Sequence, residues 1–362
     1  MKDILKTIFV IIGTMIGAGF ASGQEIYLFF NKYGTMGIFG LIISCALTGI
    51  IIYKVFQIVK NKKIHTYSEF LENISSNKKI NKIMQIMIQG FLLVSFYIMV
   101  AGFSAYFNQE FGILIYIPAV IMAILCYITF INDTKGIVYI NTILIPFLCA
   151  FIFYLGIKNL GFTNIYFENN IIVNYQWGWL FSSILYASYN SILLIPILIE
   201  LGNYMNTKNK IKKVSIWCAI ILSVLGLILF FLLLRGINYA QDLELPMIQI
   251  TKDFGNTHSI IYGIVILIAI FTTAISSGYG FLKNLPTKKY KVATIIVCAT
   301  SVLVVPVGFS NLVNLLYPIF GVLGLVQIFG IIKCKYTDNG ENIQEKNKCR
   351  RNSIEIKEKY WK

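Results

Sequence analysis

Long apolar stretches alternate with shorter polar ones along almost the whole chain. Each apolar stretch is about 20 residues long, the length that an α-helix needs to cross the hydrocarbon core of a bilayer. The apolar residues form continuous runs and do not alternate with polar ones, which excludes an outer-membrane barrel. The pattern predicts an all-α polytopic membrane protein with about ten transmembrane helices. They are expected at residues 4–31, 35–59, 83–107, 113–131, 136–157, 177–201, 214–234, 258–282, 292–308 and 311–332.

Two of the predicted spans contain polar interruptions at matching places. The first span includes GTMIGAGFASGQE, from Gly13 to Glu25, and the sixth includes LYASYNSILLIPI, with a polar cluster at 188–191. Five spans separate the two, so the two halves of the chain would have opposite topology. Interrupted helices at corresponding places in two halves are typical of a transporter binding site. We therefore predict a five-plus-five inverted repeat with broken first and sixth helices, in which residues 1–160 and 170–333 are the two halves.

The distribution of charge predicts the orientation. Lysines and arginines gather in the loops after the second, sixth and eighth spans and in the charged tail, residues 334–362, whereas the other loops contain few. Positive charge marks the cytoplasmic side of a membrane protein, so both termini are expected in the cytoplasm and the protein in the inner (cell) membrane. The long loop 235–257 carries the weakly apolar piece LELPMIQITKDF, which predicts a short helix on the outer side.

Composition supports a membrane protein and argues against one class of partner. The chain is 57% hydrophobic and only 13% charged, with a mean hydropathy of +0.72, whereas soluble domains carry about 25% charged residues. The net charge of +15 lies in loops and tail and not on a basic helix with aromatic residues, so we expect no nucleic-acid partner. The first 21 residues resemble a signal peptide, but apolar sequence resumes at Ile26, so we expect them to be retained.

Residues for covalent or metal chemistry are sparse. The seven cysteines form no CxxC pair, and His65 and His258 stand alone, so neither a disulfide framework nor a histidine or cysteine metal site is expected. The sequence contains no glycine-rich phosphate loop and no nucleophile–base pair. A membrane-embedded enzyme would need paired carboxylates or histidines at membrane depth, and none is found. We expect no enzymatic activity and no cofactor other than a coupling ion.

A break in the first span would expose backbone groups. The amides after the break suit a carboxylate, and the carbonyls before it suit a cation or an ammonium group. Glycines permit such a break because they have no Cβ. The small-xxx-small spacing of Gly13, Gly17 and Ala21 fits close helix packing equally well. The dense Gly17-Ala18-Gly19 and the polar Gln24 and Glu25 that follow favour the break.

Two other polar features lie within predicted spans. Thr273, Ser276 and Ser277 in the eighth span stand at i, i+3 and i+4, so they share one helix face and could form an oxygen site for a small cation. Alternatively, these hydroxyls bond back to their own helix or join two helices. Glu25 is a candidate for gating or proton transfer, because intramembrane charges are usually functional. It lies toward the outer end of its span, where it could reach water or pair with Arg235.

The motif GTMIGAGFASGQEI, followed by FF and YGTMG, resembles the opening of the YkvI-like bacterial membrane proteins. These are classed with the amino-acid permeases of the amino acid–polyamine–organocation superfamily. The specific motif covers about Gly13 to Gly37, whereas the hydropathy pattern agrees over all ten spans. The resemblance implies the inverted-repeat fold of the bacterial leucine transporter. It also implies a substrate site between the first, third, sixth and eighth helices.

The resemblance also implies roles for individual residues. A sodium site would use the carbonyls of Gly13 and Ile16 with Thr273, Ser276 and Ser277. A substrate carboxylate would meet the amides of Gly17, Ala18 and Gly19 and the hydroxyl of Tyr97. The opposite wall of the substrate site would be formed by Ser188, Tyr189 and Asn190.

The sequence departs from this family pattern in three places. Phe20 stands where a second sodium site needs an amide side chain, and the sixth span lacks the glycines that many relatives use. Proton-coupled relatives place a lysine inside the fifth span, but here Lys135 and Lys158 only flank it, which favours sodium over protons.

The features together predict a secondary active transporter. The most specific expectation is sodium symport of a small amino acid, or of a related amine or carboxylate, by alternating access. Two alternatives stay open. One is a proton-coupled permease, and the other is a membrane ligand sensor of the same fold that transports nothing, such as a germinant-receptor subunit. The expected partners are a small-molecule substrate and the lipid bilayer.

Overall fold

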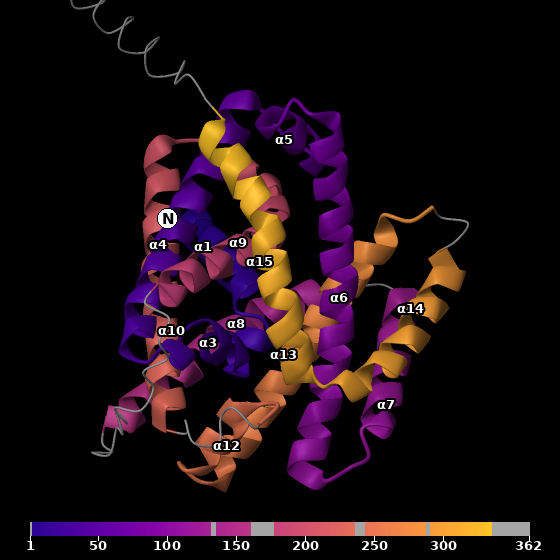
Figure 1. Ribbon diagram of the computed structural model, residues 1–362. Coiled ribbons are helices and arrows are strands. Elements are labelled where there is room, and N and C mark those ends of the chain that lie inside the picture. The colour runs from indigo at the N-terminus through magenta and orange to yellow at the C-terminus, as the bar shows by residue number, and fades with distance from the viewer. Residues whose placement is uncertain (1, 132–134, 161–176, 236–242, 287–289, 335–362) are drawn as a thin grey trace, which may run out of the picture.

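The computed structural model describes residues 2–131, 135–160, 177–235, 243–286 and 290–334 (Figure 1). Within these ranges every predicted span coincides with helical structure. Seven helices are long and apolar enough to cross a membrane, and two further apolar helices are shorter. The chain is therefore a polytopic helical membrane protein, as the sequence predicts. Apart from Cys334, the predicted charged tail lies outside the described residues.

The described residues form a series of helices. In chain order they are α1 (Lys2–Met15), α2 (Ala18–Ala21), α3 (Gln24–Phe29), η1 (Asn31–Tyr33), α4 (Thr35–Lys62), α5 (Tyr67–Ile74), α6 (Lys78–Phe111), α7 (Tyr116–Ile131), α8 (Lys135–Leu160), α9 (Gly178–Leu201), η2 (Gly202–Tyr204), α10 (Lys208–Arg235), α12 (Pro246–Lys252), α13 (Asn256–Lys283), α14 (Tyr290–Val304), η4 (Val305–Val307) and α15 (Phe309–Lys333).

The first predicted span is broken twice, which confirms the expectation from its glycines. Gly17 is extended, with φ −85° and ψ −174°, and separates α1 from α2. Gly23 has a left-handed φ of 86° and separates α2 from α3. A side chain would strain the backbone at Gly23, and a Cβ there would also lie 2.9 Å from Met247 and 3.0 Å from Leu233.

The predicted break in the sixth span is wrong, because α9 runs without interruption from Gly178 to Leu201. Its polar residues are satisfied without opening the helix. Asn190 Nδ2 and Ser191 Oγ donate to the carbonyls of Tyr186 and Ser188 in the same helix, and Ser188 Oγ donates to the carbonyl of Gly321 on α15 at 2.7 Å. The polar cluster therefore joins two helices and does not mark a break.

The helices pack into one bundle around the broken span. α13 packs along α6, α15 along α9, and α4 contacts both α9 and α10. α1 contacts α8, α9 and α10. In Figure 1 the short helices α5 and α12 lie at opposite ends of the bundle. α12 lies within the loop 235–257, where the sequence predicts a short helix.

Close approach of α9 and α15 depends on small residues. A Cβ at Gly324 would lie only 2.5 Å from the Ser188 carbonyl oxygen and 2.8 Å from Ser188 Oγ. Many large apolar side chains are exposed on the outside of the bundle, among them Leu5, Phe39 and Ile83. Such a surface suits the hydrocarbon of a bilayer, in which polar groups must be satisfied inside the protein.

Candidate functional site

The carboxyl group of Glu25 is buried beside the break in the first span. Glu25 is the second residue of α3, and only 3% of its surface is exposed. The side chain lies over Gly19 of α2, where a Cβ would overlap Glu25 Oε1 and lie 3.1 Å from Cγ and Cδ. The expectation that Glu25 could reach water at the outer end is therefore wrong in this conformation. The glycine at position 19 makes the room that the carboxyl group occupies.

Aromatic side chains surround the Glu25 carboxyl group. Tyr186 and Tyr189 of α9 interact with it directly. The ring of Tyr189 stacks on Phe29 of α3, with 5.8 Å between centroids, and on Tyr317 of α15, with 4.7 Å. Tyrosines from α9 and α15 thus face one carboxyl group. Glu25 Oε2 is buried and has no hydrogen-bond partner among the described residues.

The ion pair that Glu25 could make with Arg235 does not form among the described residues. Arg235 Nε lies 3.5 Å from Asp253 Oδ2, near the end of the bundle that carries α12. A neighbouring ion pair joins Lys252 Nζ to Glu110 Oε1 at 2.8 Å. These charges hold α12 to its surroundings and leave Glu25 without a cation from this side.

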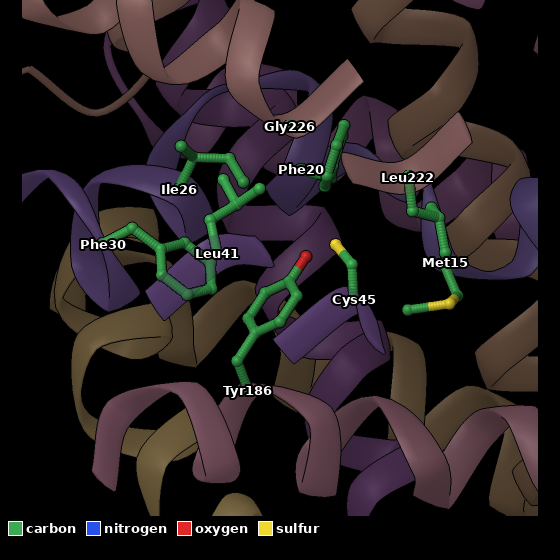
Figure 2. Close-up of a pocket in the computed structure, with 9 residues that line it drawn as sticks. All are labelled: Met15, Phe20, Ile26, Phe30, Leu41, Cys45, Tyr186, Leu222 and Gly226. Atoms are coloured by element: carbon green, nitrogen blue, oxygen red, sulfur yellow. The ribbon is translucent and has the colours of Figure 1, made fainter. Parts of the chain in front are cut away.

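A small pocket adjoins the site (Figure 2). The pocket has a volume of about 10 Å³. This is about the room that one water molecule needs. Figure 2 shows the Tyr186 hydroxyl directed into the pocket, on the side of Cys45. The residues that line the pocket are nearly all apolar. They are Met15, Phe20, Ile26, Phe30, Leu41, Cys45, Tyr186, Leu222 and Gly226.

The segment that leads into α12 is hydrogen-bonded to the second half of the broken span. Gln24 Nε2 donates to the carbonyls of Leu243, at 2.6 Å, and Glu244, at 3.1 Å. The Met247 amide donates to the Ser22 carbonyl at 3.1 Å. From α13, the Tyr262 hydroxyl donates to the Ala21 carbonyl at 2.7 Å. The backbone groups freed at the second break are therefore bound by protein.

Further contacts extend this closure to α15 and α6. The Ser310 amide donates to Glu244 Oε2 at 2.6 Å, and Ser310 Oγ lies 3.4 Å from Gln24 Oε1. Gln109 of α6 exchanges two hydrogen bonds with the backbone of Leu245. Burial raises the pKa of Glu244, although the amides of Ser310 and Phe309 act to lower it. We call Gln24, Gln109, Glu244 and Ser310 the α12 latch, because together they tie four elements at one end of the bundle.

The residues of the predicted sodium site are only partly brought together. A Cβ at Gly17 would lie 4.0 Å from Thr273 Oγ1, so the first break faces α13. However, Ser276 Oγ and Ser277 Oγ donate to the carbonyls of Thr272 and Thr273 in their own helix. Ser276 is exposed and Ser277 is buried. This is the alternative that the spacing left open, and the sodium site stays a prediction.

The first break has carbonyl groups before it and amide groups after it. Among the described residues, no backbone hydrogen bond outside the helices uses the carbonyls of Gly13 and Ile16 or the amides of Gly17, Ala18 and Gly19. These groups are the ones that the sequence assigns to a cation and a carboxylate. Gly13 packs against Ile145 of α8, which occupies the place of a Cβ there.

Three residues assigned to the substrate site are directed elsewhere. The Tyr97 hydroxyl lies 2.7 Å from Thr300 Oγ1 on α14. Ser188 faces α15, and the Asn190 amide is bonded within α9. Of the predicted opposite wall, Tyr189 alone is shown to interact with the break region, through Glu25.

Sequence reasoning missed Tyr186, Gln24 and Tyr262 as site residues. Tyr186 precedes Tyr189 by three positions, so an uninterrupted helix places both rings on one face. That signal was present in the sequence and was hidden by the expectation of a break. The roles of Gln24 and Tyr262 depend on contacts across more than 200 residues, and nothing local indicates them.

Two relatives from Bacillus subtilis match almost the whole chain. No model of a known protein family matches the sequence. The chain is 30% identical to the uncharacterized membrane protein YkvI over 335 residues, which covers 90% of this chain and 94% of that protein. It is 27% identical to the uncharacterized protein YyaD over 324 residues, covering 89% and 94% of the two.

Solved structures share the fold at low sequence identity. The inward-facing conformation of Mhp1 superposes with a TM-score of 0.60 and 11% identity, and the match covers 91% of this chain and 75% of that one. A manganese transporter from Eremococcus coleocola gives 0.57 and 16%, covering 92% and 81%. At these identities the likeness establishes the fold alone.

Proposed function

This chain belongs to the family of the Bacillus subtilis membrane protein YkvI, and we propose that it is a secondary active transporter. The observation that carries the proposal is the broken first span with a buried carboxyl group beside it. Non-helical backbone at membrane depth is tolerated only where it lines a cavity or is bound by protein. Ionisable groups at that depth mark substrate or ion pathways. The fold shared with a manganese transporter is consistent with this function.

The substrate in this proposal is a small amino acid or a related amine or carboxylate. Free amides at Gly17 and Ala18 suit a carboxylate, whereas the Glu25 carboxyl group and the faces of Tyr186 and Tyr189 suit an amine. The groups needed for both ends of an amino acid thus lie on α2, α3 and α9. Glu25, Tyr186 and Tyr189 are buried, so the site must open before such a molecule binds.

The bundle contains contacts of the kind that would open and close in alternating access. The α12 latch binds the second half of the broken span to α6 and α15. We infer that this end faces the outside of the cell, because the basic loops gather at the other side of the predicted spans. Release of the latch would then expose the site to the outside, and movement of α1 would expose it to the cytoplasm. An inner-membrane location with cytoplasmic termini belongs to the same proposal.

One candidate for the coupled cation is sodium, which the sequence favours, and the other is a proton. Free carbonyls at Gly13 and Ile16 support sodium, and so does the approach of Thr273 to Gly17. The hydroxyls of Ser276 and Ser277 donate to carbonyls of their own helix, which leaves the lone pairs of both oxygens for a cation. Oxygen ligands of this kind suit a small hard cation.

The proposal is tested by ligand binding to the purified protein. Thermal unfolding is measured with each of the 20 standard amino acids and with small amines and carboxylates, in sodium and in potassium buffer. A ligand at 100 times its Kd stabilises the folded state by about 2.7 kcal/mol. We expect one chemical class to stabilise the protein, and Gly17→Leu to abolish the effect while Gly90→Leu preserves it. A Cβ at Gly90 meets no atom within 4 Å, which makes this variant a matched control.

The outcomes separate the alternatives. Stabilisation that requires sodium and is lost in Ser276→Ala with Ser277→Ala supports the sodium site. Stabilisation without any flux in reconstituted vesicles supports a ligand sensor of the same fold. Absence of stabilisation by every compound contradicts the proposed substrate class.

A further inference from the structure

Glu25 is an acidic group that the bundle encloses without supplying a compensating charge. It is 3% exposed, and its Oε2 atom has no hydrogen-bond partner among the described residues. In the same part of the chain, no lysine, arginine or histidine forms an ion pair with it. An ionised carboxylate in such surroundings is strongly unfavourable unless it is paired or fully hydrogen-bonded.

The elements packed against α3 bring no charge to Glu25. α9 contributes Tyr186 and Tyr189, and α15 contributes Tyr317. Lys32 of η1 lies over the ring of Tyr33, with its Nζ 5.1 Å from the ring centroid.

The two remaining neighbours of α3 are α2 and α10. α2 has no titratable side chain in its sequence AGFA. The arginine that ends α10 pairs with Asp253 near α12. The groups that face Glu25 are therefore phenols, which are neutral at pH 7.

The space around Glu25 limits what could neutralise it. The adjoining pocket, which Tyr186 lines, has room for about one water molecule, and the ring of Tyr189 stacks on both Phe29 and Tyr317. An amine or a hydrated metal ion does not fit among them without rearrangement. A proton needs no room, and it converts the unpaired Oε2 into a neutral hydroxyl.

We propose that Glu25 carries a proton in this closed conformation and that this proton is the cation coupled to substrate movement. The inference rests on the proposed transport function and names its coupling ion. When the site opens to water on one side, the Oε2–H bond breaks and the proton passes to water. When it opens on the other side, the same bond forms with a proton from that water. Return to the closed conformation requires the proton on Glu25.

Infrared difference spectroscopy of the purified protein at pH 7 tests the proton directly. We expect the carbonyl stretching band of a protonated carboxyl group in the wild type and its loss in Glu25→Gln. Glutamine has nearly the same size, and thermal unfolding shows whether the variant is folded. Glu25→Asp provides a second variant, in which the band should shift and remain. Glu200→Gln, which alters an exposed carboxyl group at the end of α9, should leave the band unchanged. A wild-type spectrum identical to that of folded Glu25→Gln would overturn the proposal.

Transport in proteoliposomes separates this inference from the proposed function. The probe is a pool of the 20 standard amino acids, and the driving force is an inward proton gradient or an inward sodium gradient. We expect the wild type to accumulate solute under the proton gradient. Glu25→Gln should lose this accumulation and still exchange labelled for unlabelled solute. Accumulation driven by the sodium gradient alone would contradict the proton as coupling ion and would support the transport function. Absence of all flux would contradict the transporter, and the infrared band would still decide whether Glu25 holds a proton.

Discussion

Replacement of Gly19 by alanine tests the placement of the Glu25 carboxyl group. The added Cβ would overlap Glu25 Oε1 and lie 3.1 Å from Cγ and Cδ, so the carboxyl group must move. Overpacking of this kind costs about 1–3 kcal/mol. Alanine in place of a helical glycine recovers up to about 1 kcal/mol. We therefore expect Gly19→Ala to lower the free energy of unfolding by about 1–2 kcal/mol.

A double-mutant cycle isolates the contact. In the Glu25→Ala background the clash is absent, so Gly19→Ala should be neutral or stabilise by up to about 1 kcal/mol. The interaction energy between the two sites is then about 2 kcal/mol, well above the additivity error of about 0.5 kcal/mol. Reversible unfolding in detergent micelles gives the four values. Gly17→Ala serves as the control, since its Cβ would meet only Thr273 Oγ1 at 4.0 Å. Equal costs of Gly19→Ala in the two backgrounds would refute the reasoning.

Three further predictions concern the contacts around the site. Gly324→Leu should destabilise the protein by about 3 kcal/mol or more, since it forces α15 away from Ser188 of α9; an unchanged unfolding midpoint would contradict the packing. Because burial raises the pKa of Glu244, its contribution to stability is present at acidic pH and is lost as pH rises through that raised pKa. Glu244→Gln should flatten this part of the pH dependence of the unfolding midpoint. A pH profile identical to that of the wild type would contradict the role of Glu244. Gln24→Ala removes two hydrogen bonds to the segment before α12 and should increase protease cleavage of that segment. Gln85→Ala, on the exposed surface of α6, should not. Equal cleavage of the two variants would contradict the α12 latch.

The break in the first span could be predicted from the sequence because glycine has a distinct backbone preference. Gly17 and Gly23 adopt the conformations that end one helix and begin the next. The same reasoning failed for α9, where polar residues without glycine suggested a break. Serine and asparagine can bond to carbonyls of their own helix or a neighbour, as Ser188 and Asn190 do. Polarity alone therefore does not distinguish a broken helix from a satisfied one.

The depth of Glu25 could not be predicted from its position in the span. The left-handed turn at Gly23 redirects the chain, so that the residue expected near the outer surface lies over Gly19. Its partners Tyr186 and Tyr189 are about 160 residues away in the sequence. The spacing of Ser276 and Ser277 likewise fits both an ion site and hydrogen bonds within the helix. Only contacts between distant segments distinguish these possibilities.

Solute uptake into proteoliposomes tests the central claim most directly. Wild-type protein, Gly17→Leu and Gly90→Leu are reconstituted, exposed to a pool of amino acids, amines and carboxylates under an ion gradient, and the internal contents are measured by mass spectrometry. The account predicts that the wild type and Gly90→Leu accumulate at least one member of the pool, and that Gly17→Leu does not. Failure of the wild type to accumulate any solute, or equal uptake by Gly17→Leu, would contradict a transport pathway through the broken first span.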